Sequence, residues 1–186
     1  GAVTAMLEAR SVALVGASPR PGSFGERMII EARRSSARMH LVNPRYRDID
    51  GIACAPSLAE LDEPVDLVLL GVPDGALTGE LAAAAAIDAR SAVIFGSANG
   101  PQLRESIVRI ATDAGMAVCG GGCMGFVNTV TGLRALGYLE PDPLPVGGVS
   151  LVTHSGSAFS TLLRARRGFG FRLAVSSGQE LVTTTA

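Results

Sequence analysis

The sequence predicts a doubly wound α/β fold, in which helices cover both faces of a parallel sheet. Short apolar runs alternate along the chain with segments of helical spacing. The apolar runs are hydrophobic throughout and do not alternate with polar residues, which is typical of strands buried on both faces. A length of 186 residues with 47% hydrophobic residues is enough for one large domain or two small ones.

The alternation begins with the run SVALVGA at residues 11–17, followed by helical spacing over residues 24–34. Further strands are expected at 39–43, 65–72, 91–96 and 116–120, with helices at 75–87 and 102–115. A glycine at the end of the last helix is a usual stop signal. These elements predict a Rossmann-like domain over residues 1–140.

A change of composition follows. Residues 120–148 are rich in glycine and proline and show no long periodic segment, and 141–147 are expected to be a linker. Then come a strand and turn at 148–157, a helix at 158–168, and a strand and turn at 171–178. Residues 148–186 are therefore expected to be the beginning of a second, flavodoxin-like α/β domain. Because so small a unit buries too little surface to be stable alone, we expect this domain to be incomplete here.

Composition also restricts the partners. A formal net charge of -1, from 16 basic and 17 acidic residues, gives no overall field to attract nucleic acid or an anionic membrane. The longest alanine run is soon interrupted by Asp88 and Arg90, and no leader pattern opens the chain, so a cytoplasmic protein is expected. Cys54, Cys119 and Cys123 are expected to be buried, reduced thiols, without the ligands of a structural metal site.

The first strand-to-helix turn, VGASPRPGSFG at residues 15–25, is the clearest candidate for a ligand site. Ligands of open parallel sheets bind beyond the carboxyl ends of the strands, where a helix begins with free N–H groups. Glycines permit close backbone approach, Ser18 and Ser23 supply hydroxyls, and Arg20 supplies charge. The turn therefore suits a phosphate or a pyrophosphate.

The turn departs from the dinucleotide fingerprint G-x-G-x-x-G. Serine stands at the second glycine, one extra residue precedes the third, and the second predicted strand ends in Asn43 followed by Arg45 and Arg47, without an acidic residue. These features disfavour NAD. The arginines fit a ligand with an additional phosphate, such as the 3'-phosphate-ADP part of coenzyme A (CoA), although a solvated loop would have the same composition.

Several motifs, in order, carry a family resemblance: VGAS with PGSFG, Asn43-Pro44, VDLVLLGVP, FGSANG and CGGGCMGFVN. Together they resemble the CoA-binding domain of the NDP-forming acyl-CoA synthetases, which include the succinyl-CoA synthetase α subunit and the ADP-forming acetyl-CoA synthetases. Beyond the linker, GGVSLVTHSGSAFSTLL and GFGFRLAVSSGQE resemble the beginning of the ligase domain of that family.

The resemblance implies a set of binding residues. Those expected for CoA are Ser18, Arg20, Gly22, Ser23 and Phe24 at the phosphates, Asn43, Pro44 and Arg45 at the adenosine end, Val72, Pro73, Ser97, Ala98 and Asn99 along the pantetheine arm, and Gly125 and Asn128 near the reactive end. Ser155, Gly156 and Ser157 correspond to the helix N-terminus that stabilises a phosphohistidine in the family. An ordinary serine N-cap is the alternative for that last group.

The chain also departs from the family pattern. Gly121 and Gly122 replace the usual Pro-Asn, His154 stands where Gln is usual, and Gln179 replaces Asn. The phosphorylated histidine of the family lies further along than this sequence extends, and His40 is expected to be a packed strand residue. His154 is a candidate for lining the site, and the catalytic residues stay unknown.

The resemblance implies that the complete enzyme interconverts acyl-CoA, ADP and phosphate with a carboxylate, CoA and ATP. Mg²⁺ and ATP or ADP would bind to a nucleotide-grasp domain or subunit, the other partner being an unidentified carboxylic acid or acyl-CoA. The chain alone is expected to bind CoA without completing the reaction, and a homo-oligomer is possible. A non-catalytic CoA-binding regulatory module and an NAD(P)-dependent oxidoreductase domain are the alternatives.

Overall fold

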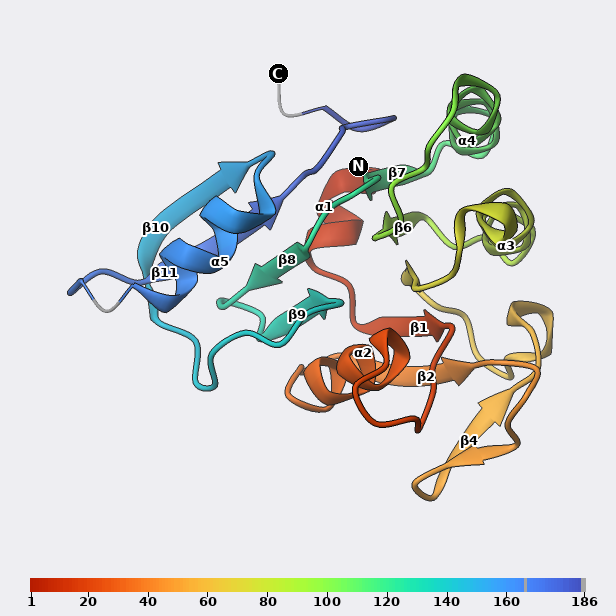
Figure 1. Ribbon diagram of the computed structural model, residues 1–186, viewed down its shortest axis with the longest axis horizontal. Helices are drawn as coiled ribbons and strands as arrows, with labels where there is room; N and C mark the ends of the chain where they lie inside the picture. Colours follow the sequence, from red (N-terminus) through yellow and green to blue (C-terminus); the bar gives the residue numbers. More distant parts are fainter. Residues whose placement is uncertain (166, 185–186) are drawn as a thin grey trace.

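The computed structural model describes residues 1–165 and 167–184, and a seven-stranded sheet forms its larger part (Figure 1). Residue 166, within the expected helix 158–168, and residues 185 and 186, within the expected second domain, lie outside the described residues. The strands of this sheet are β1 (Ser11–Val15), β2 (Arg38–Val42), β3 (Asp48–Ile49), β4 (Ile52–Ala55), β5 (Leu67–Leu70), β6 (Ser91–Ile94) and β7 (Ala117–Gly120).

The strand order, β3-β4-β2-β1-β5-β6-β7, confirms the doubly wound fold. Every pair is parallel except β3 with β4, which form a short antiparallel hairpin that the sequence patterns did not indicate. From β1 the chain winds to one side through β2 and β4, and then to the other through β5, β6 and β7. The carboxyl ends of β1, β2 and β5 therefore flank the point where the direction reverses.

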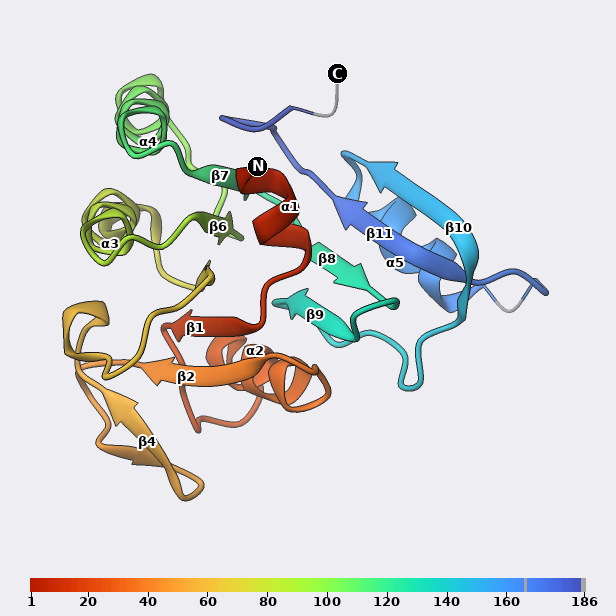
Figure 2. The ribbon, with the colours of Figure 1, turned by 180° about the vertical axis from the view of Figure 1, so that it is seen from behind.

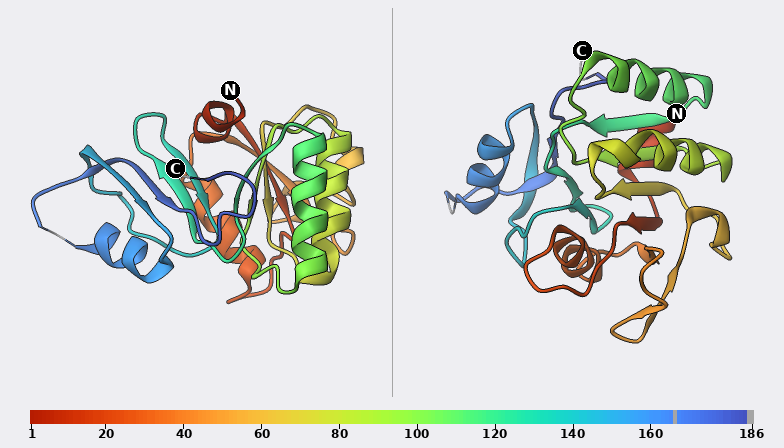
Figure 3. Two further views of the ribbon diagram at one scale, coloured as in Figure 1. Left: turned by 90° about the horizontal axis from the view of Figure 1, so that it is seen from above. Right: turned by 45° about the vertical axis from the view of Figure 1, so that its right-hand side comes forward.

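Helices cover both faces of the sheet. They are α1 (Ala2–Leu7), α2 (Phe24–Arg33), the 3₁₀ turn η1 (Leu58–Glu60), α3 (Asp74–Ala86) and α4 (Pro101–Asp113); a further helix, α5 (Gly156–Arg164), packs against the second sheet. Figure 3 (left) shows α3 and α4 on one side of the sheet and α1 and α2 on the other. Each side has its own core, because Val12 and Leu14 of β1 point towards α2 while Ala13 and Val15 point towards α3.

A second sheet follows, in the order β10-β11-β8-β9. Its strands are β8 (Gly125–Asn128), β9 (Leu133–Leu136), β10 (Val146–Thr153) and β11 (Phe171–Ser176). β10 lies at its outer edge, parallel to β11, whereas β8 is antiparallel to both β11 and β9 (Figure 2). Because β8 and β9 have four residues each, they are too short to produce a long periodic pattern in residues 120–148. The boundary at residue 140 stays a prediction, and the pairing of β8 with β11 crosses it.

Strands β8 and β9 of the second sheet are buried on both faces, whereas the edge strand β10 is largely exposed. Phe126 and Val175 point into the core shared with the first sheet and α2. Val127 points the other way, against Phe159 and Leu163 of α5. Neighbouring residues of β8 thus lie in two different cores, because successive side chains of a strand point to opposite faces of the sheet.

A buried polar network joins α2 to α5. Glu31 of α2 is fully buried, and its carboxylate accepts from Arg134 Nε at 2.7 Å and from the backbone N–H of Glu140 at 3.0 Å. Glu140 in turn accepts from Ser160 Oγ at 2.5 Å and lies 3.3 Å from Arg164 Nε. Burial raises the pKa of Glu140, and the contacts with Ser160 and Arg164 only partly oppose this. Glu140, directly before the expected linker, therefore belongs to a continuous set of hydrogen bonds and ion pairs between the two helices.

The three cysteines are buried and unpaired, as expected for reduced thiols. Cys123 donates to the carbonyl oxygen of Ile94 at 3.4 Å, and its contact with the Cys119 thiol, together with burial, raises its pKa. Within residues 1–165 and 167–184, none of the helices has the length and apolar character needed to cross a membrane.

Candidate functional site

A cleft of about 470 Å³ opens at the carboxyl ends of β1, β2 and β5. Open α/β sheets bind ligands at this kind of position, where the strand order reverses. The cleft brings together nine of the residues predicted to bind CoA: Ser18, Arg20, Ser23, Phe24, Asn43, Pro44, Arg45, Val72 and Pro73. Three segments far apart in the sequence therefore meet at one edge of the sheet.

The glycine turn after β1 forms the floor of the cleft. Gly16 has a φ of +92°, and a Cβ at this position would overlap the carbonyl oxygen of Gly71, at the end of β5. A Cβ on Gly25, in the first turn of α2, would overlap the carbonyl oxygen of Gly16. Both glycines are thus required for the tight approach of β1, β5 and the beginning of α2.

The N-terminus of α2 is capped within the same turn. Ser23 is the N-cap, and its hydroxyl accepts from the N–H of Glu26 at 3.1 Å. The Glu26 carboxylate accepts from the N–H of Gly22 at 2.6 Å, so the turn resembles a capping box in which the returning bond goes to the residue before the N-cap. Gly22 therefore does not offer a free amide, and a ligand phosphate would have to bind beside the Glu26 carboxylate. The serine hydroxyls and the remaining amides of the first turn are the available donors.

The loop after β2 forms one wall. Asn43 donates from Nδ2 to the carbonyl oxygen of Ala17 at 2.8 Å, and its Oδ1 accepts from the N–H of Arg45 at 3.0 Å. This side chain thus joins the loop after β2 to the glycine turn after β1. Arg45 and Arg20 are both exposed at the cleft, where the positive charge of each remains available to an anion.

The beginning of α3 forms the opposite wall. Pro73 is the N-cap of the helix, and Pro73, Ala76 and Glu80 all face the cleft, at the spacing of one helical face. Burial raises the pKa of Glu80, which is half-buried. The sequence analysis did not single out Ala76 or Glu80, although the spacing from Pro73 could have indicated them.

The loop Ser97–Asn99 lies beside the cleft, where it contacts α3 but does not line the cavity. Asp74 at the beginning of α3 accepts from the N–H of Ala98 at 3.2 Å and from that of Asn99 at 2.8 Å. The carbonyl oxygen of Ser97 accepts from Gln179 Nε2 at 2.7 Å. This loop therefore links the first sheet to the turn after β11.

Gly125 and Asn128 lie in β8, away from the cleft. A Cβ on Gly125 would overlap the carbonyl oxygen of Ala135 in β9, which explains the glycine by strand packing. Asn128 donates to the carbonyl oxygen of Leu7 at 2.9 Å and accepts from the N–H of Val130 at 3.1 Å. The Asn128 side chain is thus engaged at the end of β8 that contacts α1.

The predicted phosphate-binding residues lie at a separate place, the N-terminus of α5. Ser155 is the N-cap, its hydroxyl accepting from the N–H of Ala158 at 3.2 Å, and its own N–H donates to Thr153 Oγ1 at 3.1 Å. His154 is 69% exposed, and its Nε2 lies 3.3 Å from Glu180 Oε1. The pair is an ion pair only when His154 is protonated.

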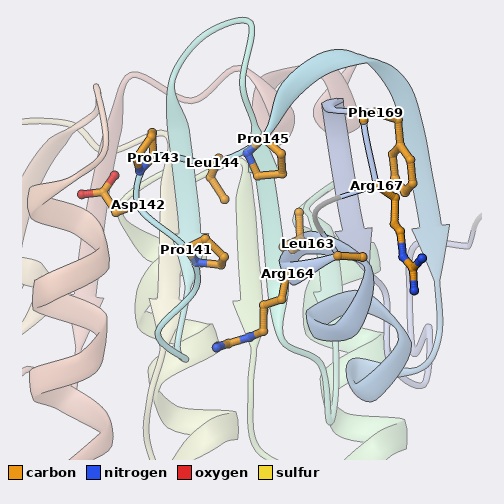
Figure 4. Close-up of a pocket in the computed structure, with 11 residues that line it drawn as sticks. Pro141, Asp142, Pro143, Leu144, Pro145, Leu163, Arg164, Arg167 and Phe169 are labelled. Carbon is orange, nitrogen blue, oxygen red and sulfur yellow. The ribbon is translucent and has the colours of Figure 1, made fainter.

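A second hollow, of about 730 Å³, lies between the proline-rich linker and the end of α5 (Figure 4). Pro141, Leu144 and Leu163 line it. The guanidinium of Arg164 is already bonded to the carbonyl oxygen of Leu139 at 2.6 Å. None of the predicted binding residues lines this hollow, so the candidate site is the cleft at the strand ends.

The sequence model of the CoA-binding domain family matches residues 10–129 and thus includes every residue that lines this cleft. The chain belongs to the CoA-binding domain family. Acetate–CoA ligase (ADP-forming) I of Archaeoglobus fulgidus is 29% identical over 178 residues, 91% of this chain and 26% of the relative. Acetate–CoA ligase (ADP-forming) of Methanocaldococcus jannaschii is 28% identical over 177 residues, 92% of this chain and 25% of the relative. This chain spans about a quarter of the length of these two relatives.

Solved structures support the fold. The dinucleotide-forming acetyl-coenzyme A synthetase 1 of Ca. Korarchaeum cryptofilum, in complex with phosphate and ADP, superposes with a TM-score of 0.88 at 22% identity, over 96% of this chain and 40% of that chain. ATP citrate lyase of Methanothrix soehngenii, in complex with citrate and coenzyme A, gives a TM-score of 0.66 at 14% identity, over 93% of this chain and 32% of that chain. Family and relatives together confirm the resemblance to the ADP-forming acyl-CoA synthetases.

Proposed function

We propose that this chain binds CoA in the cleft at the ends of β1, β2 and β5, as the CoA-binding part of an ADP-forming acyl-CoA synthetase. The observation that carries the proposal is the meeting of three predicted segments, residues 18–24, 43–45 and 72–73, in one cleft inside the family match. Serine hydroxyls and helix amides suit the pyrophosphate, and the two exposed arginines suit the 3'-phosphate.

The residues present fit such a ligand. Gly16 and Gly25 have no side chain, and a Cβ at either position would overlap neighbouring backbone. The two glycines therefore allow a compact turn whose backbone can approach a phosphate. Arg20 and Arg45 have no carboxylate partner among the residues that the structure describes, so an anionic ligand would not have to break an ion pair. Val72 and Pro73 give the pantetheine arm an apolar path out of the cleft.

In this proposal the N-terminus of α5 holds a phosphate group in a later step, with Ser155, Gly156 and Ser157 around it. The relatives named as ADP-forming ligases support a reaction in which a phosphoryl group is transferred. Mg²⁺ and ATP or ADP would bind to a nucleotide-grasp domain or subunit outside this chain. The exposed Val146, Val149 and Val152 of the edge strand β10 support a contact with further polypeptide or with a second copy.

The proposal is tested by calorimetric titration of the 186-residue chain with CoA, 3'-dephospho-CoA and NADH. We expect CoA to bind with a micromolar to submillimolar dissociation constant and dephospho-CoA to bind more weakly. Gly22→Asp should abolish binding, because it puts a carboxylate in the phosphate turn.

Gly168→Asp is the matched control. Both glycines have positive φ, +74° and +76°, and open space around a built Cβ, so both variants carry the same backbone strain. Gly22 lies between Arg20 and Ser23, which line the cleft, whereas Gly168 lines the separate hollow beside the linker. The Gly168→Asp variant should therefore bind CoA like the wild type. Binding of NADH without binding of CoA would contradict the proposal and indicate an aberrant dinucleotide site.

A further inference from the structure

Glu80 is the one acidic residue among those that line the cleft, and it lacks a partner. No described group of the protein forms a hydrogen bond or an ion pair with its carboxylate. Asp74, on the same helix, differs, because both of its oxygens accept backbone N–H groups of the Ala98–Asn99 loop. Asp74 thus has a structural role that explains it, whereas Glu80 has none.

The position of Glu80 makes an unpartnered carboxylate costly. The side chain is half-buried, burial raises its pKa, and no positive charge opposes that effect. A ligand that fills the cleft displaces the water around this carboxylate, and a carboxylate without water or a donor is strongly destabilising. A ligand that covers this carboxylate therefore binds better if it brings a hydrogen-bond donor to Glu80.

The surroundings indicate what kind of group carries that donor. Pro44, Pro56 and Ala76 line the same cavity as Glu80 with apolar surface, and Tyr46 adds an aromatic ring. Such surfaces suit a flat ring with a polar edge. CoA has several donors, in its ribose, its pantetheine arm and its adenine, but only the 6-amino group of adenine is attached to a flat aromatic ring.

We propose that the carboxylate of Glu80 accepts a hydrogen bond from the 6-amino group of adenine and thereby determines the base specificity of the cleft. A guanine base would present a carbonyl oxygen at that place, and two acceptors would then face each other. The phosphates are expected at residues 18–24 and at Arg45, so the carboxylate contacts the base and not the phosphates. This inference rests on the proposed function, because it assumes that CoA occupies the cleft.

The test compares CoA with desamino-CoA, in which a hydrogen replaces the 6-amino group, on the wild-type chain and on variants of Glu80. Glu80→Met removes the acceptor and keeps the length of the side chain, whereas Glu80→Gln keeps a neutral acceptor. Glu105→Met is the matched control, since Glu105 is exposed on α4 outside the cleft. Unfolding in denaturant shows whether each variant is folded.

For the wild type, we expect desamino-CoA to bind about tenfold more weakly than CoA, the range of one hydrogen bond to a charged group. Glu80→Met should lose about tenfold for CoA and less than about twofold for desamino-CoA, Glu80→Gln should lose less, and Glu105→Met should resemble the wild type. Equal binding of the two ligands by the wild type, or equal losses for both in Glu80→Met, would overturn the inference while leaving CoA binding intact. A wild-type chain that binds neither ligand would overturn the proposed function as well. If Glu80→Met does not fold, the wild-type comparison and Glu80→Gln still decide.

Discussion

Helices α2 and α5 begin in the same way and yet make very different sites. Each follows a parallel strand, and each has a serine N-cap whose hydroxyl accepts a backbone N–H, at 3.1 Å for Ser23 and 3.2 Å for Ser155. The N-terminus of α2 lies within a cleft whose walls come from β2, β5 and α3. That of α5 is exposed, with His154 and Ser157 open to solvent.

The comparison shows that a helix N-terminus becomes a specific site only through what surrounds it. The amides and the dipole are common to both helices. Only α2 has the long glycine turn that brings its first turn against β1 and β5, and the Asn43 side chain that fixes a second loop beside it. Substitutions can test whether the two helix N-termini differ in ligand binding as this geometry indicates, and whether the buried network holds the two helices together.

The largest effect is expected in the buried polar network that connects α2 to α5. Arg134→Met removes the main partner of the fully buried Glu31 carboxylate and should lower the free energy of unfolding by about 3–5 kcal/mol. The measurement is chemical denaturation of both proteins. Arg33→Met is the control, because the ion pair of Arg33 with Asp50, at 3.2 Å, is exposed and should contribute no more than about 1 kcal/mol. Similar losses in the two variants would mean that the buried network does not hold the regions together.

The next largest difference is expected when a methyl group is added at the N-terminus of each helix. Gly25→Ala places a Cβ against the backbone oxygen of Gly16 and should cost about 2–3 kcal/mol of stability, together with CoA binding. In Gly156→Ala the Cβ meets only the flexible side chain of Met124, at 2.8 Å, so a change within about 1 kcal/mol is expected. Thermal unfolding and calorimetric titration measure the two effects. A Gly25→Ala chain that binds CoA normally would show that the close approach is not needed.

Removing the caps should have equal effects on stability and unequal effects on binding. Ser23→Ala and Ser155→Ala each lose one capping bond, worth about 1 kcal/mol. Only Ser23→Ala should weaken CoA binding, by about fivefold, because only its hydroxyl lines the cleft. Weakened CoA binding in Ser155→Ala would place part of the ligand at α5 and remove the distinction between the two ends.

The smallest effect concerns the pH dependence of stability. Burial raises the pKa of Glu80 in the folded protein above its value in the unfolded chain. The stabilisation from protonated Glu80 is therefore complete at pH values below the unfolded-state pKa and is lost as the pH rises through the folded-state pKa. Relative to the wild type, Glu80→Gln should become more stable over that rise, by less than about 1 kcal/mol because the half-exposed carboxyl is screened by solvent. Denaturation at several pH values gives the difference, and a pH-independent difference would contradict the raised pKa.

The sequence predicted the first sheet well because its signals are local. Val12 to Val15 are apolar at every position, and the strand is followed at once by a turn and a helix, so the pattern could be interpreted without knowledge of the rest of the molecule. β8 and β9 gave no such signal. They are short and begin or end near glycines. They are strands only because Gly125 allows β8 to approach β9 and because β11, more than 40 residues further along, pairs with β8.

The candidate site also contains features that the sequence predicted and features that it did not. The glycine turn, the Asn43–Arg45 loop and the Val72–Pro73 step were predicted, since each follows directly from a strand end. Glu26 and Glu80 were not, although the spacing Ser23-x-x-Glu26 and the helical spacing of Glu80 from Pro73 could have indicated them. Glu26 matters because its carboxylate bonds the Gly22 amide, and Glu80 matters because α3 turns it towards a cavity that two other segments complete.

The sequence by itself determined the α/β class and the succession of the main strands and helices along the chain, and it predicted the turn at which a phosphate would bind, because short-range periodicity and glycine placement encode them. Only the tertiary structure decided that the second sheet joins the two regions, that Glu31, Arg134 and Glu140 share a buried network, and that Glu80 faces the cleft without a partner. These features depend on contacts between residues far apart in the chain. Burial and hydrogen-bond partners are properties of such contacts, and a linear pattern does not contain them.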